Sequence, residues 1–176
     1  MVLPQTLKLR DGRSSSLRSA KPDDAKAWVD HVNRVGSEGV YLMTEHFTRK
    51  LEELQRQFLG SDSSSALWLV AEIDGSLVAA ADIQRGQFKK NAHTASLGMS
   101  VEKQFRGAGL GTAILKVLLD WARENQVRKV KLGVFSTNER AIRLYQRFGF
   151  SEEGRLRNDI ILDGKPADLI QMALWL

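Results

Sequence analysis

Three glycines within five positions are the strongest chemical signal in this sequence. Gly107, Gly109 and Gly111 lie in the stretch QFRGAGLGTAILKVLL, residues 104–119. They stand between a strand-like segment and a helical pattern, so they line a helix N-terminus, where backbone N–H groups lack intrahelical partners and the dipole is positive. Without side chains, this backbone can approach a phosphate closely. The spacing therefore predicts an anion-binding loop, and the alternative interpretation is a tight strand-to-helix turn.

Two other phosphate-binding motifs do not fit this loop. A P-loop requires G-x-x-x-x-G-K-[ST], and GAGLGTA has no lysine at that place. A dinucleotide-binding fingerprint requires G-x-G-x-x-G and an acidic residue about 20 positions later. The glycines here are spaced G-x-G-x-G, and the segment KVKLGVFS, residues 129–136, contains no acid. What fits is Q-x-x-G-x-G, formed by Gln104, Gly107 and Gly109.

The segments around the loop predict the elements that position it. Apolar residues recur at helical spacing from Leu110 to Ala122, so one face of this helix is expected to pack on a sheet. Asp74-Gly75 predicts a hairpin, because a type I′ turn requires positive φ at both central residues. Further helices are expected over 21–35, 45–59 and 138–149, and strands over 66–73, 76–84, 93–101, 129–136 and on both sides of LDGK at 162–165.

This order of elements, with one early strand before the first helix, predicts an α/β fold. We expect a mixed, mostly antiparallel sheet of about seven strands, with about four helices on both faces. The length of 176 residues predicts a single domain over residues 1–176.

Composition excludes several classes of site. There is no cysteine, which rules out disulfides, thiolate metal sites and a cysteine nucleophile. The three histidines lack metal-ligand spacing, so no metal is expected. The longest apolar run, ALWLVA at 66–71, is too short for a membrane span, and the first ten residues lack the apolar stretch of a signal peptide. We therefore expect a cytoplasmic protein with no membrane partner.

The formal net charge of +5 leaves two interpretations open. Lys and Arg are dispersed, which is typical of a solvated basic surface. The other interpretation is an anionic partner, either a phosphorylated cofactor or nucleic acid. No basic run is interleaved with aromatic residues as a single-strand binding surface requires, so no nucleic-acid partner is expected.

A second segment joins the glycine loop to indicate a family. TNERAIRLYQRFGF, residues 137–150, contains an Asn, an Ala and then L-Y-x-x-x-G-F. With the Q-x-x-G-x-G loop, it resembles the signatures of the GNAT superfamily of N-acetyltransferases, and the element order from Ser16 onward also matches. Residues 93–111 and 153–174 resemble the branch of small bacterial enzymes that includes amino-acid and phosphinothricin-type acetyltransferases.

The resemblance implies acetyl-CoA as donor and a primary amine as acceptor, with direct attack of the amine on the thioester. It also implies a fourth strand splayed by a bulge, which Gly98 fits, so that the backbone of Met99, Ser100 and Val101 faces the pantetheine and acetyl group. The Arg106 side chain is expected to add positive charge at the pyrophosphate. The backbone of the loop is expected to bind it, through these residues: Arg106, Gly107, Ala108, Gly109, Leu110, Gly111 and Thr112.

Tyr145 matches the family tyrosine that often protonates the leaving thiolate and lies at the cofactor. A hydroxyl pKa near 10 in water suits that donor role. The alternative interpretation is a core tyrosine, since Tyr145 shares a helix face with Ala141, Ile142 and Phe148. Asn138 begins the same helix; it is expected to cap it and, by the resemblance, to contact the cofactor.

The proton acceptor for the amine is not evident in the sequence. The best-known members of the family carry a glutamate at a place that falls near Ala95, and TASLG contains no acid. Glu72, Asp82 and His93 are candidates by proximity in the fold, with solvated strand residues or a water relay as the alternatives. Acceptor recognition in the family involves the first two helices and their loop. There Glu38 and Tyr41 are the candidate substrate residues.

The leading hypothesis is an acyl-CoA-dependent N-acetyltransferase acting on a small-molecule amine or an amino acid. A protein N-terminal or lysine acetyltransferase is the second hypothesis, and an open channel in place of a closed pocket would distinguish it. The third hypothesis is a module that binds acetyl-CoA without turnover, and the fourth is a basic nucleic-acid binder. A homodimer is compatible with all four hypotheses.

Overall fold

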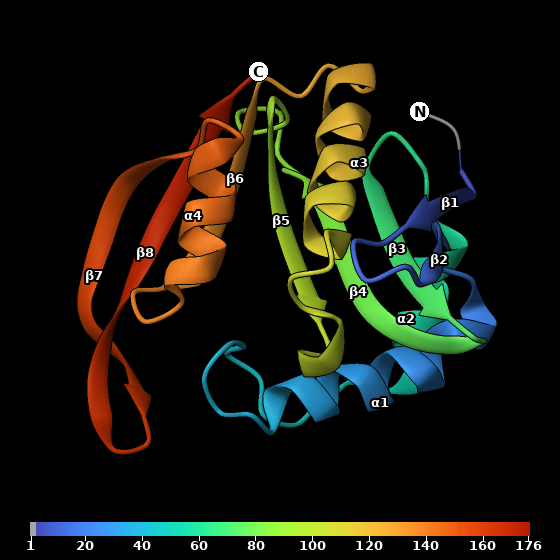
Figure 1. The fold of residues 1–176 in the computed structure, drawn as a ribbon. Helices are drawn as coiled ribbons and strands as arrows, with labels where there is room; N and C mark the ends of the chain where they lie inside the picture. Colours follow the sequence, from blue (N-terminus) through green and yellow to red (C-terminus); the bar gives the residue numbers. More distant parts are fainter. Residues whose placement is uncertain (1–2) are drawn as a thin grey trace.

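The computed structural model describes residues 3–176, which form a mixed sheet of eight strands (Figure 1). In sheet order the strands are β1 (Gln5–Lys8), β2 (Ser14–Ser19), β3 (Ala66–Ile73), β4 (Ser76–Arg85), β5 (Thr94–Val101), β6 (Lys129–Phe135), β8 (Lys165–Trp175) and β7 (Ser151–Leu162). The α/β class and mostly antiparallel sheet are confirmed. The count exceeds the expected seven because residues 5–19 form a hairpin where one early strand was predicted.

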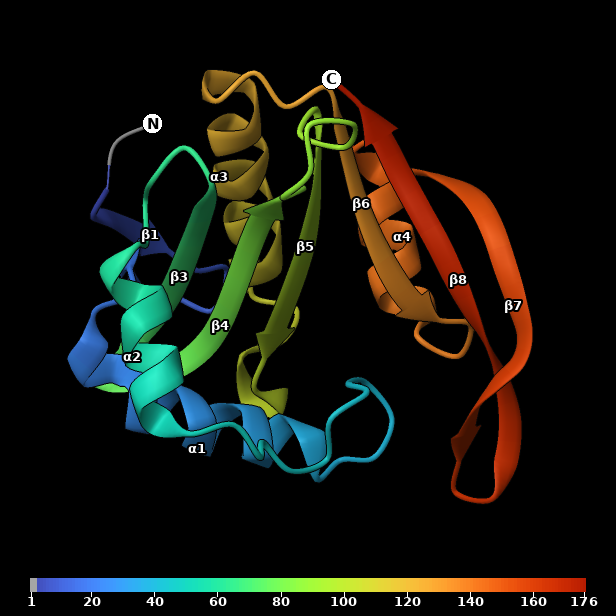
Figure 2. The same ribbon diagram turned by 180° about the vertical axis from the view of Figure 1, so that it is seen from behind.

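Four α-helices cover the sheet, two on each face (Figures 1 and 2). α1 (Ala25–Gly36) and α2 (Leu51–Leu59) lie on one face, and α3 (Leu110–Glu124) and α4 (Glu139–Arg147) on the other. Two short 3₁₀ helices, Pro22–Asp24 and Lys103–Phe105, precede α1 and α3. None of the described helices is long and apolar enough to cross a membrane.

α2 is shorter than the helix predicted over 45–59. It begins at Leu51 because the preceding chain is held against α1, where the Phe47 N–H donates to the side-chain oxygen of Asn33 at 2.7 Å. The hairpin prediction is confirmed. Asp74 and Gly75 have φ of 50° and 76°, the two positive values that a type I′ turn requires.

Each face of the sheet has its own hydrophobic core. On the α3 face, the apolar side of the helix packs on β3, β4 and β5, as its spacing predicts, with Ile114, Leu118 and Trp121 fully buried. On the α1 face, Trp28, Phe58 and Trp68 pack with ring centroids 5.2–5.6 Å apart. Burial of each such side chain contributes about 1.5–3 kcal/mol, so both helix layers are firmly attached to the strands between them.

The sheet opens between β5 and β6, its parallel pair. Only Thr94–Ser96 pairs with β6, and beyond Ser96 the facing edge of β5 has no strand partner within residues 3–176. The prediction of a bulge at Gly98 is wrong, because the β4–β5 register runs without interruption from Ala79↔Val101 to Arg85↔Ala95. Gly98 pairs with Asp82 in this ladder, and a Cβ on Gly98 would lie in ordinary contact, 3.4 Å from the Asp82 Oδ1. The splay therefore comes from divergence of β5 and β6.

Candidate active site

A cavity of about 680 Å³ opens where β5 and β6 diverge. Its walls come from β5, β6, the glycine loop, α4 and the segment between α1 and α2. Most of the residues predicted for the site line this cavity: Tyr41, Met99, Ser100, Val101, Arg106, Gly107, Gly109, Gly111, Thr112, Asn138 and Tyr145. The structure thus brings together three sequence segments: residues 99–112, residues 138–145 and the chain around Tyr41.

The glycine loop has the backbone geometry that its spacing predicts. Gly107 and Gly109 adopt φ of 90° and 99°, and Gly109 directly precedes the first residue of α3. A Cβ on Gly109 would meet nothing within 4 Å, so the space beside it is open. Ala108 and Leu110 do not line the cavity; both are buried and anchor the loop in the core. A ligand can therefore approach the backbone here.

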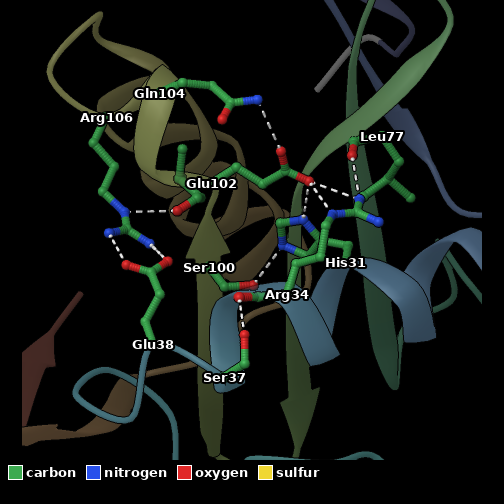
Figure 3. Close-up of polar contacts among 10 residues, drawn as sticks. His31, Arg34, Ser37, Glu38, Leu77, Ser100, Glu102, Gln104 and Arg106 are labelled. Carbon is green, nitrogen blue, oxygen red and sulfur yellow. Dashed lines mark hydrogen bonds and ion pairs between the residues drawn. The ribbon is translucent and has the colours of Figure 1, made fainter.

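Arg106 is neither a solvated loop residue nor a free cation. Its guanidinium donates to both carboxylate oxygens of Glu38 at 2.7 and 2.5 Å, and its Nε donates to the Val101 carbonyl at 2.8 Å (Figure 3). It also lies 4.3 Å from the centre of the Tyr41 ring. We call Arg106, Glu38 and Tyr41 the Arg106 clamp. An ammonium group bound by Glu38 would share the carboxylate with Arg106.

Three arginines that the sequence analysis did not select also line the cavity: Arg10, Arg140 and Arg147. Two of them contact the loop: the Arg10 N–H donates to the Ala108 carbonyl at 3.0 Å, and the Arg140 Nη2 lies 2.9 Å from the position that a Cβ on Gly107 would occupy. In the sequence Arg140 looks like an ordinary exposed helical arginine. The one feature that could have identified Arg140 is its position in the first turn of α4, directly after Asn138 and Glu139. That turn faces the start of α3 across the cavity.

Tyr145 and Asn138 both occupy the positions predicted for them in α4. Asn138 caps the helix, since its Oδ1 accepts from the Ala141 N–H at 3.2 Å. The Tyr145 ring is only 6% exposed and packs on Phe150, yet the residue lines the cavity. Burial raises the pKa of Tyr145 to about 12, so its hydroxyl is protonated at neutral pH. Tyr145 is therefore both a core residue and a residue of the cavity wall.

A second cavity of about 330 Å³ lies on the α1 face of the sheet. It shares Leu42, Met43, Gly98, Met99 and Ser100 with the first cavity, so the two meet at β5. Aromatic side chains of Trp28, Phe47 and Trp68 form part of its wall, together with the charged side chains of Arg49 and Asp82.

The structure separates the three candidates for the proton acceptor. Glu72 is paired with Arg18 at 2.6 Å and lines neither cavity. His93 precedes β5 at the end remote from the opening, where its carbonyl accepts from the Arg128 N–H. Asp82 lines the smaller cavity, and burial raises its pKa to about 6, while a hydrogen bond from Gln84 at 2.8 Å lowers it. Of the three, only Asp82 lines one of these two cavities, and it pairs in the sheet with Gly98, a residue shared by both.

His31 is a polar residue of this region that the sequence analysis missed. It is fully buried, and its Nε2 lies 2.8 Å from the Ser100 Oγ. Its only signal in the sequence is its position between Trp28 and Val35, on the buried face of α1. A histidine on such a face gives no indication of which strand it meets.

Comparison with known proteins gives a family that agrees with this geometry. Residues 33–150 match the model described as the acetyltransferase (GNAT) family. The L-amino acid N-acetyltransferase AaaT of Escherichia coli (strain K12) is 30% identical over 109 residues, covering 60% of this chain and 65% of that protein. The spermine/spermidine N(1)-acetyltransferase of Bacillus subtilis (strain 168) is 40% identical over 57 residues, covering 32% of this chain and 38% of that protein.

The chain thus spans less than two thirds of the length of these relatives. The structural match is more extensive. A crystal structure of an acetyltransferase of the GNAT family from Streptococcus pneumoniae superposes with a TM-score of 0.86 at 26% identity, covering 92% of this chain and 99% of that one. The family model and the matching fold confirm the identification made from the glycine loop and the L-Y-x-x-x-G-F segment: this chain belongs to the acetyltransferase (GNAT) family.

Proposed function

We propose that this chain, as a single domain over residues 1–176, transfers an acetyl group from acetyl-CoA to the primary amine of a small molecule, with amino acids as the preferred acceptors. The proposal rests on one observation above all. The glycine loop, Tyr145 and the unpaired edge of β5 line one cavity, and a second cavity meets it at Ser100.

The residues of the larger cavity fit an acyl-CoA. Open space at positive φ beside Gly109, the N–H groups at the start of α3 and the Arg140 guanidinium suit an anionic pyrophosphate. The edge of β5 at residues 99–101 offers backbone groups to the amides of the pantetheine and to the thioester carbonyl. Acetyl-CoA, when bound, supplies an acetyl group activated as a thioester. An N–H directed at the developing oxyanion is worth about 2.7–4 kcal/mol.

We assign Tyr145 as the proton donor to the departing thiolate. A pKa of about 12 keeps the hydroxyl protonated at neutral pH but makes it a weaker acid than a tyrosine in water, so the assignment rests on its place in the cavity, where packing against Phe150 holds the ring. Asn138 holds the first turn of α4 and so positions Tyr145 along the cavity. The donor role for Tyr145 is the one that the family resemblance implies; for Asn138 the resemblance implies a contact with the cofactor, and Asn138 lines the same cavity.

The smaller cavity suits the acceptor. Its volume of about 330 Å³ is at the small-ligand end of the range for binding sites, about 300–1,000 Å³. Asp82 offers a carboxylate to an ammonium group, and Arg49 offers a guanidinium to a carboxylate. The positive charge of Arg49 lowers the pKa of Asp82, so the two groups lie within electrostatic reach. A zwitterionic amino acid matches this pair, and the similarity to a protein named as an L-amino acid N-acetyltransferase supports the same class.

Release of the CoA thiol tests the proposal. Purified protein and acetyl-CoA would be assayed with amino acids, the matching amino-acid amides, polyamines and short peptides. We expect turnover with amino acids and at least about tenfold lower kcat/KM with the amides, because losing one charge-assisted contact costs about 1.5–3 kcal/mol. Turnover with peptides alone would favour a protein acetyltransferase. No thiol release with any amine would overturn the proposed function.

A further inference from the structure

His31 is a buried titratable residue that the roles assigned above leave unused. Its side chain extends from α1 toward β5, where Nε2 lies 2.8 Å from the Ser100 Oγ (Figure 3). On its other side, Nδ1 lies 3.5 Å from Oε1 of Glu102 and has no hydrogen-bond partner within the described chain, residues 3–176. An imidazole between a hydroxyl and a carboxylate has the connections of a proton relay.

The neighbours of His31 determine where its proton lies. A carboxylate only accepts hydrogen bonds, so Glu102 favours a proton on Nδ1. The other nitrogen, Nε2, is then the acceptor, and the Ser100 hydroxyl donates to it. Glu102 is itself held in place, because Arg34 donates to its Oε1 at 2.7 Å and Gln104 to its Oε2 at 3.3 Å.

Ser100 stands at the junction of the two cavities. It is one of the five residues that line both of them. Its side chain lies on the α1 face, diagonally across the β4–β5 ladder from Asp82, since Ala80 pairs with Ser100 and Asp82 pairs with Gly98. An amine that enters from the smaller cavity and a thioester in the larger one would meet beside this hydroxyl.

We propose that Ser100, His31 and Glu102 form a relay that removes a proton from the acceptor amine, a step that rests on the proposed acetyl transfer. As the nitrogen lone pair forms the new C–N bond, the amine N–H breaks and the Ser100 oxygen takes that proton. The original Ser100 proton moves to His31 Nε2. The C–S bond electrons leave with the sulfur, which takes the Tyr145 proton. Ser100 is the catalytic residue, and His31 and Glu102 act through it.

The surroundings of His31 suit this role. Burial lowers the pKa of His31; the nearby Glu102 carboxylate and the Ser100 backbone oppose this effect, and Arg34 reinforces it. The imidazole is therefore neutral at neutral pH and keeps a lone pair on Nε2. When Nε2 takes a proton, Glu102 faces the resulting imidazolium from the opposite side. The relay also supplies the proton acceptor that the sequence lacks near Ala95.

The histidine tautomer gives a test that needs no substrate. Two-bond ¹⁵N–¹H correlation spectra of the uniformly labelled protein distinguish Nδ1–H from Nε2–H imidazoles, and the signals lost in His31→Gln identify His31. We expect the Nδ1–H tautomer at pH 7.5. An Nε2–H tautomer, which would donate to Ser100, would overturn the relay.

Kinetics test the same proposal through the chemical step. For Ser100→Ala and His31→Gln we expect kcat to fall by about 100-fold, with the KM for acetyl-CoA within about twofold of wild type. The double variant should lose no more than the single ones, because the two residues act as one unit. Ser37→Ala is the matched control: Ser37 follows α1, its hydroxyl donates to the Arg34 carbonyl, and the activity of this variant should equal wild type.

Two kinetic results and one result from mass spectrometry would overturn the relay while leaving the proposed function intact. They are near-wild-type kcat in Ser100→Ala, multiplicative losses in the double variant, and an acetyl group found on Ser100 by mass spectrometry after incubation with acetyl-CoA alone. If His31→Gln does not fold, Ser100→Ala decides the kinetic test, and the remaining histidine signals of wild type are assigned through His46→Gln and His93→Gln. Absence of thiol release by wild type with every amine would instead overturn the proposed function.

Discussion

The proposed sites on the two sides of β5 differ in how much they depend on backbone groups and how much on side chains. On the α3 side, the proposed donor site uses the backbone of the loop at 106–112 and of the strand edge at 99–101, together with the side chains of Arg140 and Tyr145. On the α1 side, the proposed acceptor site is made of side chains that come from α1, β4, β5 and the segment before α2. A site made of backbone is encoded by local residue types, whereas a site made of side chains depends on which distant elements meet.

The Arg106 clamp joins these two sides. Glu38 and Tyr41 belong to the segment between α1 and α2, and Arg106 belongs to the glycine loop. Arg106, which was expected to bind the donor, therefore contacts Glu38 and Tyr41, which were expected to bind the acceptor. The following predictions separate the three parts: donor site, acceptor site and clamp.

The largest effect is expected from Gly109→Val on the donor side. A valine at a φ of 99° is strained, and its side chain would fill the open space proposed for the pyrophosphate. We expect acetyl-CoA affinity to fall by roughly 100- to 10,000-fold, the equivalent of about two lost charge-assisted hydrogen bonds. Isothermal titration with acetyl-CoA measures the change.

Gly12→Val is the matched control for that substitution. Gly12 has a φ of 88° and nothing within 4 Å of an added Cβ, but it lies in the β1–β2 turn outside both cavities. It should show a similar loss of stability with unchanged acetyl-CoA affinity. Equal affinity in Gly109→Val and wild type would mean that the glycines only form a turn.

Tyr145→Phe tests the chemistry of the donor side without disturbing its shape. The ring and its contact with Phe150 remain, so stability should change little. We expect kcat to fall by about 100-fold, in the range for a general acid, with acetyl-CoA binding unchanged. Single-turnover measurements are needed, because slow CoA release would hide a loss in the chemical step. An unchanged single-turnover rate would leave Tyr145 as a core residue only.

Asp82→Asn tests the acceptor side, with opposite effects on activity and stability. We expect kcat/KM for the amino acid to fall by about 10- to 100-fold through loss of one charged partner. In wild type the same parameter should decline as pH falls through about 6, where Asp82 takes up a proton. An unchanged kcat/KM and pH profile in the variant would remove Asp82 from the site.

Stability responds in the other direction. Folding raises the pKa of Asp82 from 3.8 to about 6, so the folded state binds this proton more tightly than the unfolded state. The contribution of Asp82 to the free energy of unfolding is therefore fully present below about pH 4, and this contribution is lost as pH rises from 4 to 6. Asp82→Asn should raise Tm at pH 7.5 and leave it unchanged at pH 4. A lower Tm at pH 7.5 would contradict the burial of the charge.

Glu38→Gln should have the smallest effect, because it loosens the clamp without removing either site. The pair has 16% and 24% of its side chains exposed, and the side-chain oxygen of Gln would still accept from the Arg106 guanidinium. We expect the KM values for acetyl-CoA and for the acceptor to rise together by less than about fivefold. A tenfold rise for the acceptor alone would instead place Glu38 on the ammonium group.

Much of the fold follows from local rules in the sequence. Asp74-Gly75 fixes a hairpin, the apolar spacing after Leu110 fixes the buried face of α3, and Asn138 marks the start of α4. The failures have physical reasons. A four-residue strand such as β1 carries too little pattern to identify, and Phe47 continues a helical spacing although its backbone is bound to Asn33.

The donor site was predictable for the same reason, and the acceptor site was not. Gly98 looks like a bulge in the sequence because its regular pairing partner, Asp82, is 16 positions away on another strand. His31 and Ser100 lie 69 positions apart, and neither residue indicates the other. Alternation along β4 places Asp82 on one face but does not say that a cavity lies over it. Contacts between residues so far apart in the sequence are evident only in the folded structure, where the helices pack on the sheet.

The most direct test of the central claim is thermal stabilisation of the wild-type protein by acetyl-CoA. A ligand that binds only the folded state raises Tm by mass action, and at 100 times its Kd the expected rise is roughly 5–10 °C for a chain of this size. Acetyl-CoA and CoA should both produce it, because both carry the pyrophosphate that we place on the glycine loop. NAD and ATP should produce much smaller shifts. An equal shift with NAD would contradict the assignment of this cavity to acetyl-CoA.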